Sequence, residues 1–303
     1  MLLEFICNEN GSRLDTFISN SAEGSYTRSY FSGLISDGKV TVNGKVITKN
    51  GYKLSDGDKV TVDIPPVVDT DTRPEDIPLD VVYEDDDLII INKPQGMVVH
   101  PAAGHHEGTL VNALLAHCDG RLSDINGVIR PGIVHRIDKD TSGLMVAVKN
   151  NETHVKMAEM IARHEVVRQY RAVVYGVISH DKGTIDAPIG RANGDRRKMV
   201  VTENGKPSIT HFEVVNRYTE ATDLKLLLET GRTHQIRSHM TYIGHPVVAD
   251  PLYAPRRKTY GLIGQCLHSQ TIEFDHPRTG ERISFSSDIP QYYKDLLDKL
   301  VLL

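Results

Sequence analysis

Three polar segments of the chain carry residue types suited to chemistry. The first runs from His135 to Leu144: five of its ten residues are ionisable, although apolar runs flank it on both sides. Asp140, Thr141, Ser142 and Gly143 favour tight turns and local side-chain hydrogen bonds. We expect this segment to lie at a strand end and to face a cleft. A charged surface loop is the alternative if the segment is considered alone.

The second and third segments are far from the first in sequence. Tyr170 lies in a β-branched stretch, and on a strand it shares one face with Arg168. In the segment from Gly231 to His239, helical spacing puts His234 and Arg237 on one face, near the positive end of a helix. Considered alone, the tyrosine could fill a core or a surface, and the helix could present a solvated basic face.

The composition is that of an ordinary globular protein. Hydrophobic residues make up 39% and charged residues 25% of 303 positions. No apolar run reaches the about 18 residues of a membrane helix, and no export signal is visible, so we expect no membrane attachment. Three separated cysteines argue against a disulfide framework and favour the reducing cytoplasm.

Charge is unevenly distributed along the chain. The net charge is −5, which by itself argues against a nucleic-acid partner. Acidic residues gather between Asp56 and Asp87, whereas basic residues gather at 191–198, 232–237 and 256–258. Because local sign matters more than the sum when a partner docks on one face, a nucleic-acid partner stays open.

Residues 1–65 are predicted to form a small separate domain. Short helices are expected from Arg13 and from Arg28, the second with Thr27 as its N-cap. An Asn43-Gly44 turn between alternating strands predicts a hairpin. The proline-rich, acidic stretch 66–78 is predicted to be a semi-rigid linker to a second domain, 79–303.

The second domain is predicted to be α+β, with a mixed, mostly antiparallel sheet flanked by helices and loops. Its strands follow one another through short turns, with few β-helix-β crossovers. Strands are expected at 79–84, 88–93, 166–177, 208–218, 224–229, 271–274 and 282–285, and helices at 109–118, 152–164, 231–244 and 290–301.

The first domain resembles the S4 RNA-binding domain. The resemblance rests on Arg13-Leu14-Asp15, on Thr27-Arg28, and above all on Gly38-Lys39-Val40-Thr41-Val42-Asn43-Gly44. In that family the second helix and the hairpin present basic side chains to structured RNA. The resemblance therefore implicates Arg28, Lys39 and Lys45, in contacts that position the protein without reading sequence.

The second domain resembles the RNA pseudouridine synthases, in particular the ribosomal large-subunit branch that carries an S4 domain in front. His135-Arg136-Ile137-Asp138-x-x-Thr141-Ser142-Gly143 is similar to the family signature, with Ile137 where leucine is commoner. Gln169-Tyr170 resembles its tyrosine motif, although the family usually places lysine before the tyrosine. Thr230-Gly231-Arg232-Thr233-His234-Gln235-Ile236-Arg237 is nearly its third motif, and Lys93-Pro94-x-Gly96 also matches.

The resemblance implies an enzyme that converts uridine in structured RNA to its C-glycoside isomer, without metal or cofactor. Asp138 would be the nucleophile or ribose-facing carboxylate, Arg237 the cation that keeps it ionised, and Tyr170 the residue that stacks on the base and exchanges a proton. Arg136 would fill the space left by the extruded uridine. Further RNA-facing residues would be His135, which orients the loop, then Arg232, His234, Arg196, Arg197 and Lys198.

Two other functions fit parts of the sequence. Asp138-Lys139-Asp140-Thr141 matches the D-x-D-x-T pattern of magnesium-dependent phosphatases, but no regular β/α alternation follows it. A catalytically silent RNA-binding factor is the other alternative. Metal binding through His105-His106-Glu107 or Cys266-x-His268 lacks a second ligand pair.

The expected partner is structured RNA, most naturally large-subunit (23S) ribosomal RNA, and the expected oligomeric state is a monomer without protein partners. The sequence leaves open which uridines are modified. It also leaves open whether the substrate is ribosomal or transfer RNA, and whether the RNA is naked or part of an assembly intermediate.

Overall fold

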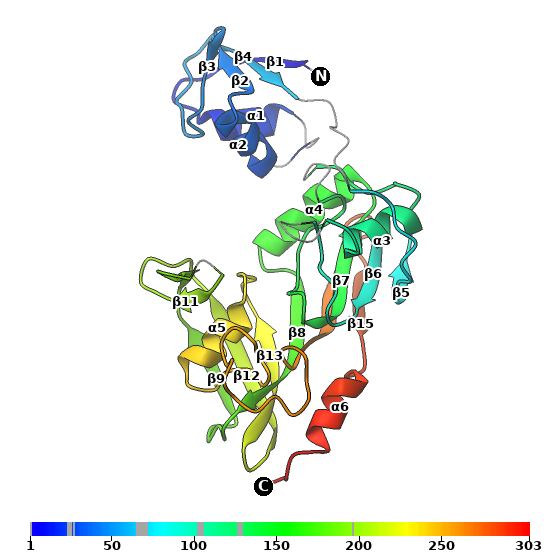
Figure 1. Cartoon of the computed structure of the whole chain (residues 1–303). Coiled ribbons are helices and arrows are strands. Elements are labelled where there is room, and N and C mark those ends of the chain that lie inside the picture. The colour runs from blue at the N-terminus through cyan, green and yellow to red at the C-terminus, as the bar shows by residue number, and fades with distance from the viewer. Residues whose placement is uncertain are drawn as a thin grey trace.

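The computed structural model describes residues 2–22, 26, 28–64, 72–101, 106–125, 130–195 and 197–303. The first part of the chain forms a small α+β domain with a four-stranded antiparallel sheet in the order β1-β4-β2-β3 (Figure 1). Its elements are β1 (Leu2–Ile6), α1 (Leu14–Ser21), α2 (Arg28–Ser36), β2 (Val40–Val42), β3 (Lys45–Val46) and β4 (Lys59–Asp63). Asn43 and Gly44 both have positive φ, 50° and 77°, which the tight hairpin turn between β2 and β3 requires. The predicted N-cap Thr27 lies outside the described residues.

A buried carboxylate joins the two helices of this domain. Asp15 on α1 is 3% exposed and accepts hydrogen bonds from Arg13 and from Arg28, the latter at 2.7 Å. Burial raises the pKa of Asp15, but the two guanidinium groups outweigh it and lower that pKa to about 2. Arg28 is thus engaged within the domain, although its side chain keeps 54% of its surface exposed.

The proline-rich stretch is partly fastened to the second domain. Residues 65–71 lie outside the described part of the chain. Beyond them, the Asn112 side chain donates to the Arg73 carbonyl, and Glu75 accepts from the Gly108 amide. The second half of the expected linker is therefore hydrogen-bonded to residues near the start of the helix that begins at Leu110.

The second domain is organised around one large sheet with the order β5-β6-β7-β14-β8-β13-β12-β9, and β15 pairs with β14. Its strands are β5 (Val81–Glu84), β6 (Leu88–Lys93), β7 (Ser142–Val148), β8 (Val167–Tyr175), β9 (Lys182–Asp186), β12 (Ile209–Arg217), β13 (Ala221–Leu228), β14 (Leu267–Asp275) and β15 (Arg282–Ser286). Only β14 and β7 pair in parallel among the described strands of this sheet. The predicted α+β class with a mixed, mostly antiparallel sheet is confirmed.

Helices cover both faces of this sheet. The core on one face contains Tyr170 and Ala172 of β8 together with residues of α3 (Leu110–His117) and α5 (Gln235–Tyr242). The other face carries α4 (Asn151–Ala162) and α6 (Gln291–Leu297) through Met157 and Tyr293. Figure 1 shows α3 beside β6 and α5 beside β12 and β13. The side chain of Tyr170 thus lies on the face that α3 and α5 cover.

Thr109 begins α3 as the sequence predicts, because its side chain accepts the Asn112 amide and the Asn112 side chain accepts the Thr109 amide. A separate hairpin of β10 (Ile189–Arg191) and β11 (Met199–Val201) lies beside the basic residues Arg197 and Lys198, and these two strands were not predicted. No helix among the described residues is both long and apolar enough to cross a membrane.

Gly143 permits β7 to approach β14 closely at the centre of the sheet. Its φ is +111°, and a Cβ atom there would lie 2.2 Å from the Ser269 carbonyl oxygen. Any other residue would therefore force β7 away from β14. Gly143 thus sets the position of β7, the strand that follows Asp138. The His135–Gly143 motif therefore contributes to the fold as well as carrying Asp138.

Candidate active site

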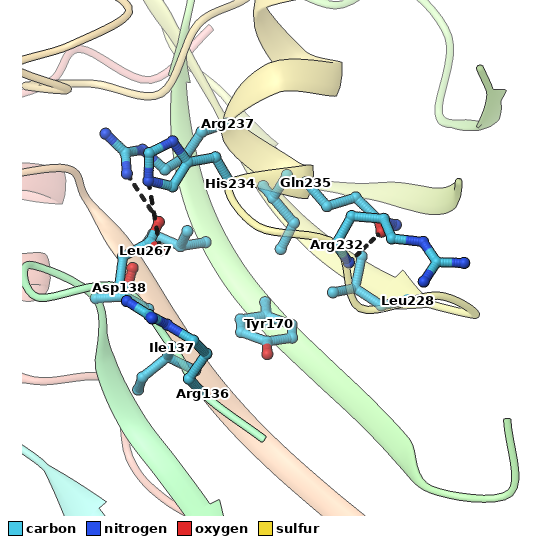
Figure 2. Close-up of a pocket in the computed structure, with 12 residues that line it drawn as sticks. Arg136, Ile137, Asp138, Tyr170, Leu228, Arg232, His234, Gln235, Arg237 and Leu267 are labelled. Atoms are coloured by element: carbon cyan, nitrogen blue, oxygen red, sulfur yellow. Dashed lines mark hydrogen bonds and ion pairs between the residues drawn. The ribbon is translucent and has the colours of Figure 1, made fainter. Parts of the chain in front are cut away.

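Asp138 lies in the turn just before β7 and faces the N-terminus of α5. Its Oδ2 accepts a 2.8 Å hydrogen bond from Arg237 Nη1, and its Oδ1 lies 3.7 Å from His234 Nε2. The Asp138 side chain is 17% exposed, whereas that of Arg237 is 6% exposed. Figure 2 shows the three side chains converging from two separate segments. The sequence expectation that Arg237 supplies a cation to Asp138 matches this geometry.

A second carboxylate, which the sequence analysis did not single out, fixes the orientation of Arg237. Asp250 is fully buried and accepts from Arg237 Nε at 2.7 Å and from Nη2 at 2.9 Å. This paired contact uses one edge of the guanidinium and leaves Nη1 for Asp138. Burial acts against the charged form of Arg237, but the hydrogen bonds and charges of the two carboxylates raise its pKa. Arg237 is therefore permanently charged and held in one orientation.

Lys93 stabilises the turn that carries Asp138. This lysine is 1% exposed, and its ammonium donates to the carbonyls of Pro94, Met97 and Lys139 at 2.8–3.0 Å. Burial lowers the pKa of Lys93 to about 7. The Gln95 side chain adds a 3.0 Å hydrogen bond to the Asp140 carbonyl. The Lys93-Pro94-x-Gly96 motif thus supports the Asp138 turn without touching its carboxylate.

Tyr170 forms the floor of the site. It is 6% exposed, lies between Arg136 and Leu228 in Figure 2, and lines the same cavities as Asp138. Burial raises the pKa of Tyr170, with smaller opposing effects from Arg168 and from a hydrogen bond with Ser269. The hydroxyl therefore stays protonated near neutral pH. An aromatic ring at the bottom of such a cavity is placed to stack on a planar base.

His234 occupies the junction between the turn and α5. It is the N-cap of α5 and adopts a left-handed conformation, φ 54° and ψ 23°, which is uncommon for a residue other than glycine. Its Nδ1 lies 3.1 Å from the Tyr253 hydroxyl, and burial lowers its pKa. His234 therefore precedes the helix rather than sharing its face with Arg237, but both side chains still reach Asp138.

Tyr253 connects this cluster to the basic hairpin. Its hydroxyl accepts from the Met199 amide and donates to the Met199 carbonyl, both at 2.9 Å, and its ring lies under Arg237 at 5.2 Å. The strand β11 is thus tied to the two residues that approach Asp138. Tyr253 was not singled out from the sequence, because its contacts with Met199, His234 and Arg237 arise only from tertiary packing.

The two residues before Ile137 have different surroundings. The Nε2 atom of His135 accepts the Val146 amide at 3.0 Å, and burial together with Arg168 lowers the pKa of His135 to about 3. A neutral ring that accepts a backbone hydrogen bond fits the expected role of orienting the loop. Arg136 is exposed, lines the cavity, and donates to His100 Nε2 at 2.8 Å.

The remaining basic residues of the predicted RNA-binding set lie in the cavity, near the β10–β11 hairpin and on the first domain. Arg232 lines the cavity and donates to the Pro207 carbonyl at 3.2 Å. Arg197 is 80% exposed and pairs with Asp195 in the hairpin loop, next to the half-buried Lys198, whereas Arg196 lies outside the described residues. Lys39 and Lys45 are exposed on the first domain, and Lys39 lies 4.0 Å from Asp63.

Gln235 shapes the turn that precedes α5. Its amide oxygen accepts from the Thr230 hydroxyl and the Arg232 amide, and its nitrogen donates to the Ile209 carbonyl and the Thr210 hydroxyl. All four hydrogen bonds are between 2.8 and 3.0 Å. This buried amide explains why glutamine follows His234 in the third motif.

Two family models match the two domains of the chain. The RNA pseudouridylate synthase family matches residues 87–242, which contain Asp138, Tyr170 and Arg237, and the S4 domain matches residues 12–60. The "Uncharacterized RNA pseudouridine synthase YlyB" of Bacillus subtilis is 50% identical over 292 residues, 96% of this chain and 95% of that protein. The chain belongs to the RNA pseudouridine synthase family. It is an enzyme that isomerises uridine in RNA to pseudouridine, and neither the phosphatase nor the silent-factor alternative finds support.

Other relatives share nearly the whole length. The "Ribosomal large subunit pseudouridine synthase D" of Zymomonas mobilis is 42% identical and covers 91% of this synthase and 90% of its own chain. The Escherichia coli protein of the same name is 40% identical and covers 96% and 91%. Among solved structures, human RNA pseudouridylate synthase domain containing 1 has a TM-score of 0.61 at 24% identity, over 75% of this synthase and 89% of its own chain. That likeness shows the fold.

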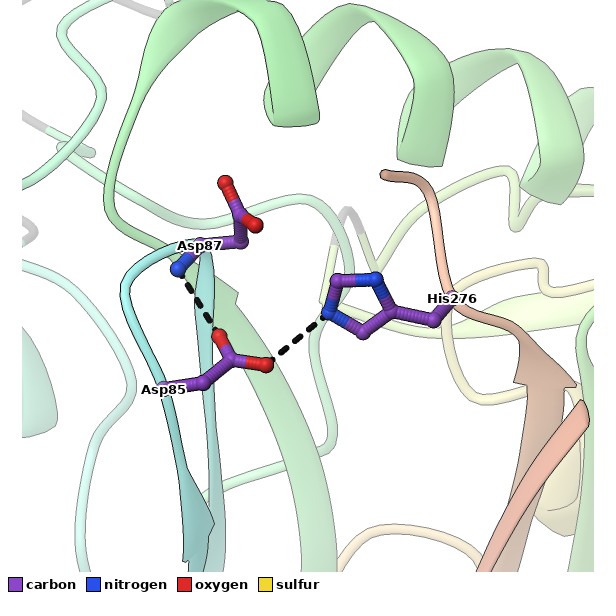
Figure 3. Close-up of side chains that lie close together, drawn as sticks. All are labelled: Asp85, Asp87 and His276. Atoms are coloured by element: carbon purple, nitrogen blue, oxygen red, sulfur yellow. Dashed lines mark hydrogen bonds and ion pairs between the residues drawn. The ribbon is translucent and has the colours of Figure 1, made fainter. Parts of the chain in front are cut away.

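One cluster of possible metal ligands lies away from this site. Asp85, Asp87 and His276 bring one ligand atom each within 4.8 Å of one another (Figure 3). His276 Nδ1 accepts the amides of Arg278 and Thr279, so Nε2 carries the proton that it donates to Asp85.

The carboxylates of this cluster are also engaged. Asp85 accepts from the Tyr83 hydroxyl and two backbone amides, and Asp87 accepts from Asn150, Thr153 and Arg278. The cluster therefore fastens the β5–β6 turn to α4 and to the β14–β15 turn, and its hydrogen bonding does not fit a metal.

Proposed function

We propose that Asp138, Arg237 and Tyr170 carry out the isomerisation and that the substrate is large-subunit ribosomal RNA. The observation that carries the proposal is the 2.8 Å contact between Arg237 Nη1 and Asp138 Oδ2 at the edge of a cavity of about 460 Å³. The reaction breaks the bond from ribose to the base nitrogen, turns the base, and rejoins it through carbon. Asp138 supplies the carboxylate that faces the ribose in this scheme.

Arg237 aims the carboxylate of Asp138 and supplies a positive charge beside it, through the 2.8 Å hydrogen bond from Nη1 to Oδ2. Because Asp250 holds the other edge of Arg237, little reorganisation is needed when the substrate arrives. The carboxylate is still partly exposed through the cavity, so a ribose carbon can approach the oxygen that Arg237 does not bind.

Tyr170 and Arg136 act on the target nucleotide. A uridine reaches Asp138 only after it leaves its stack, at a cost of a few kcal/mol. The ring of Tyr170 offers a stacking surface, and its protonated hydroxyl can donate to the sugar or base. Arg136 is exposed at the rim, and its hydrogen bond within the described residues is to the imidazole of His100, whose pKa burial lowers. It is thus placed to move into the space that the uridine vacates.

Basic groups outside the cavity hold the RNA backbone. Lys39 and Lys45 of the S4 domain and the hairpin residues Arg197 and Lys198 are the proposed phosphate contacts, with Arg232 and His234 nearer the target. Arg28 contributes less charge than the sequence suggests, because Asp15 pairs with it. We also propose that the first domain spans residues 1–65 and the second domain residues 79–303.

The relatives named for the ribosomal large subunit support the choice of substrate, since two of them cover nine tenths of this chain or more at 40–42% identity. A bacterial ribosomal substrate would place the enzyme in the cytoplasm. We propose that it acts there as a monomer, because one chain supplies Asp138, Tyr170 and Arg237.

A direct test uses purified full-length protein and transcripts whose uracil rings carry tritium at the carbon that becomes bonded to ribose. Isomerisation releases that tritium to water. We expect release from a large-subunit ribosomal RNA transcript and none from a pool of transfer RNA transcripts. Release from transfer RNA alone would contradict the proposed substrate, and release from neither would contradict the proposed activity on free RNA.

A further inference from the structure

Arg168 is a buried cation that has no ion pair or hydrogen bond with any residue the structure describes. It lies on β8, two residues before Tyr170 and on the same face of the strand, and it is 5% exposed. Within the part of the chain that the structure describes, no acceptor binds its guanidinium, and its Nε is buried without a hydrogen bond. A buried charge without a counter-ion is unfavourable, because the protein replaces neither its hydration nor its hydrogen bonds.

Two other arginines of this domain with little exposed side chain are paired with carboxylates. Arg171, three residues further along β8, pairs with Asp223. Arg237 pairs with Asp138 and Asp250. Arg171 also has a buried Nε without a hydrogen bond, but its charge has a counter-ion, whereas that of Arg168 has none among the described residues. In native structures, a buried polar group that lacks a partner often serves binding or catalysis.

The guanidinium of Arg168 lies at the active-site cavity. Together with Asp138 and Tyr170 it lines the space of about 460 Å³, which Arg136 and Arg232 also line. Its Nη1 lies against Gly231 so closely that a Cβ on that glycine would be 2.6 Å away. The glycine of the third motif therefore leaves room for this side chain. The cavity carries three guanidinium groups and one carboxylate, Asp138, which Arg237 already neutralises.

We propose that Arg168 binds an RNA phosphodiester next to the target uridine, inside the active-site cavity. This rests on the proposed function, because RNA is then the ligand that fills the cavity and phosphate is the anion it brings. Guanidinium groups bind phosphate through paired hydrogen bonds, which fix position as well as charge. A phosphate held beside Tyr170 would retain the backbone of the extruded nucleotide while the base turns.

The first test compares the salt dependence of RNA binding. The wild type, Arg168→Gln and Arg282→Gln are titrated with the same large-subunit ribosomal RNA transcript at several potassium chloride concentrations. Arg282→Gln is the control because it also removes one guanidinium, but from a half-exposed arginine on β15 that is already paired with Glu273 and Asp275. Loss of one phosphate contact should lower the slope of log affinity against log salt by about 0.7–0.9 in Arg168→Gln and leave Arg282→Gln unchanged.

Thermal unfolding separates a binding role from a structural one. Removing an uncompensated buried charge should leave the Tm of Arg168→Gln equal to the wild-type value or higher. Inorganic phosphate, at ionic strength matched with chloride, should raise the Tm of the wild type and of Arg282→Gln more than that of Arg168→Gln. Arg168→Lys keeps the charge without the planar fork and should recover part of the salt slope.

The outcomes are distinct from those that test the proposed function. A salt slope for Arg168→Gln equal to that of the wild type would overturn the subsite, as would a lowered Tm with unchanged RNA binding. Neither result depends on catalysis. If the wild type binds RNA but releases no tritium, the proposed activity fails, and the comparison of salt slopes still decides whether Arg168 contacts a phosphate.

Discussion

Arg237 and Asp138 meet at 2.8 Å although 99 residues separate them in the chain. Arg237 reaches Asp138 with Nη1 while Asp250 binds Nε and Nη2 at 2.7 and 2.9 Å. The arginine thus bridges two carboxylates, one fully buried and one 17% exposed toward the cavity. We infer that Asp250 sets the position of Arg237 and that Arg237 in turn sets the position of Asp138.

Asp250→Asn should impair catalysis although Asp250 is buried and is not expected to contact RNA. The amide can no longer accept from both Nε and Nη2, so Arg237 loses its fixed orientation. We expect kcat to fall by about tenfold or more with RNA affinity unchanged, and the free energy of unfolding to fall by about 3 kcal/mol. Single-turnover tritium release and urea unfolding measure the two effects. The matched variant Asp181→Asn, which removes a carboxylate from the half-buried Arg217, should retain kcat.

Tyr253→Phe should uncouple the basic hairpin from the site. The change removes one hydroxyl and with it the hydrogen bonds to Met199 and His234, at about 1 kcal/mol of stability. We expect kcat/KM to fall several-fold, with loss in both KM and kcat, because the hairpin and His234 both lose a fixed partner.

A second tyrosine provides the control for this prediction. The Tyr175 hydroxyl likewise donates to a backbone carbonyl, that of Lys258, and accepts a backbone amide, with Arg257 over its ring at 5.0 Å. Tyr175→Phe should cost similar stability and leave kcat/KM unchanged. Equal losses of activity in the two variants would contradict a specific role for Tyr253.

The sequence singles out the three residues that we propose for catalysis. Asp138 and Arg237 stand among ionisable neighbours, and Tyr170 lies in a predicted strand that is rich in β-branched and aromatic residues. Their meeting in one cleft could be expected only from the resemblance, since no local pattern reports a contact between residues 99 positions apart.

Other parts of the site and fold gave weaker signals. Asp250 is a single aspartate between apolar residues and a proline, so its burial beneath Arg237 depends wholly on tertiary packing. The first half of β14, from Leu267 to Gln270, is mostly polar and was not expected to lie at the sheet centre. Its polar side chains find partners there, as when His268 contacts Ser142 and Ser287. Short β10 and β11 are too brief for periodicity to reveal them.

Replacing Lys39 and Lys45 by glutamine should weaken RNA binding without changing the chemical step. Each phosphate contact contributes to the salt dependence, so the slope should fall by up to about 2 when both are lost. Filter binding at several salt concentrations measures this. Single-turnover kcat at saturating protein should equal the wild-type value. An unchanged slope would show that these lysines face solvent in the complex.

Acid should destabilise the protein through His135. Burial and Arg168 lower the pKa of His135 to about 3, so between about pH 6.5 and pH 3 the unfolded chain binds a proton here that the folded chain does not. The free energy of unfolding therefore falls as pH falls through that window, by at most about 1.4 kcal/mol per pH unit for this half-buried group. His135→Gln, whose amide oxygen can accept the Val146 amide, should flatten that dependence in urea unfolding. A dependence as steep as that of the wild type would locate the acid sensitivity elsewhere.

The central claim, that Asp138 is the carboxylate on which isomerisation depends, is tested most directly by Asp138→Asn. This variant keeps the size of the side chain and leaves Arg237 paired with Asp250. The measurement is single-turnover tritium release from a large-subunit ribosomal RNA transcript, with RNA affinity determined in parallel. We predict a rate at least about a thousandfold below that of the wild type, since loss of a catalytic nucleophile costs this much or more in other enzymes, and RNA affinity within about twofold. Tritium release at the wild-type rate would contradict the account.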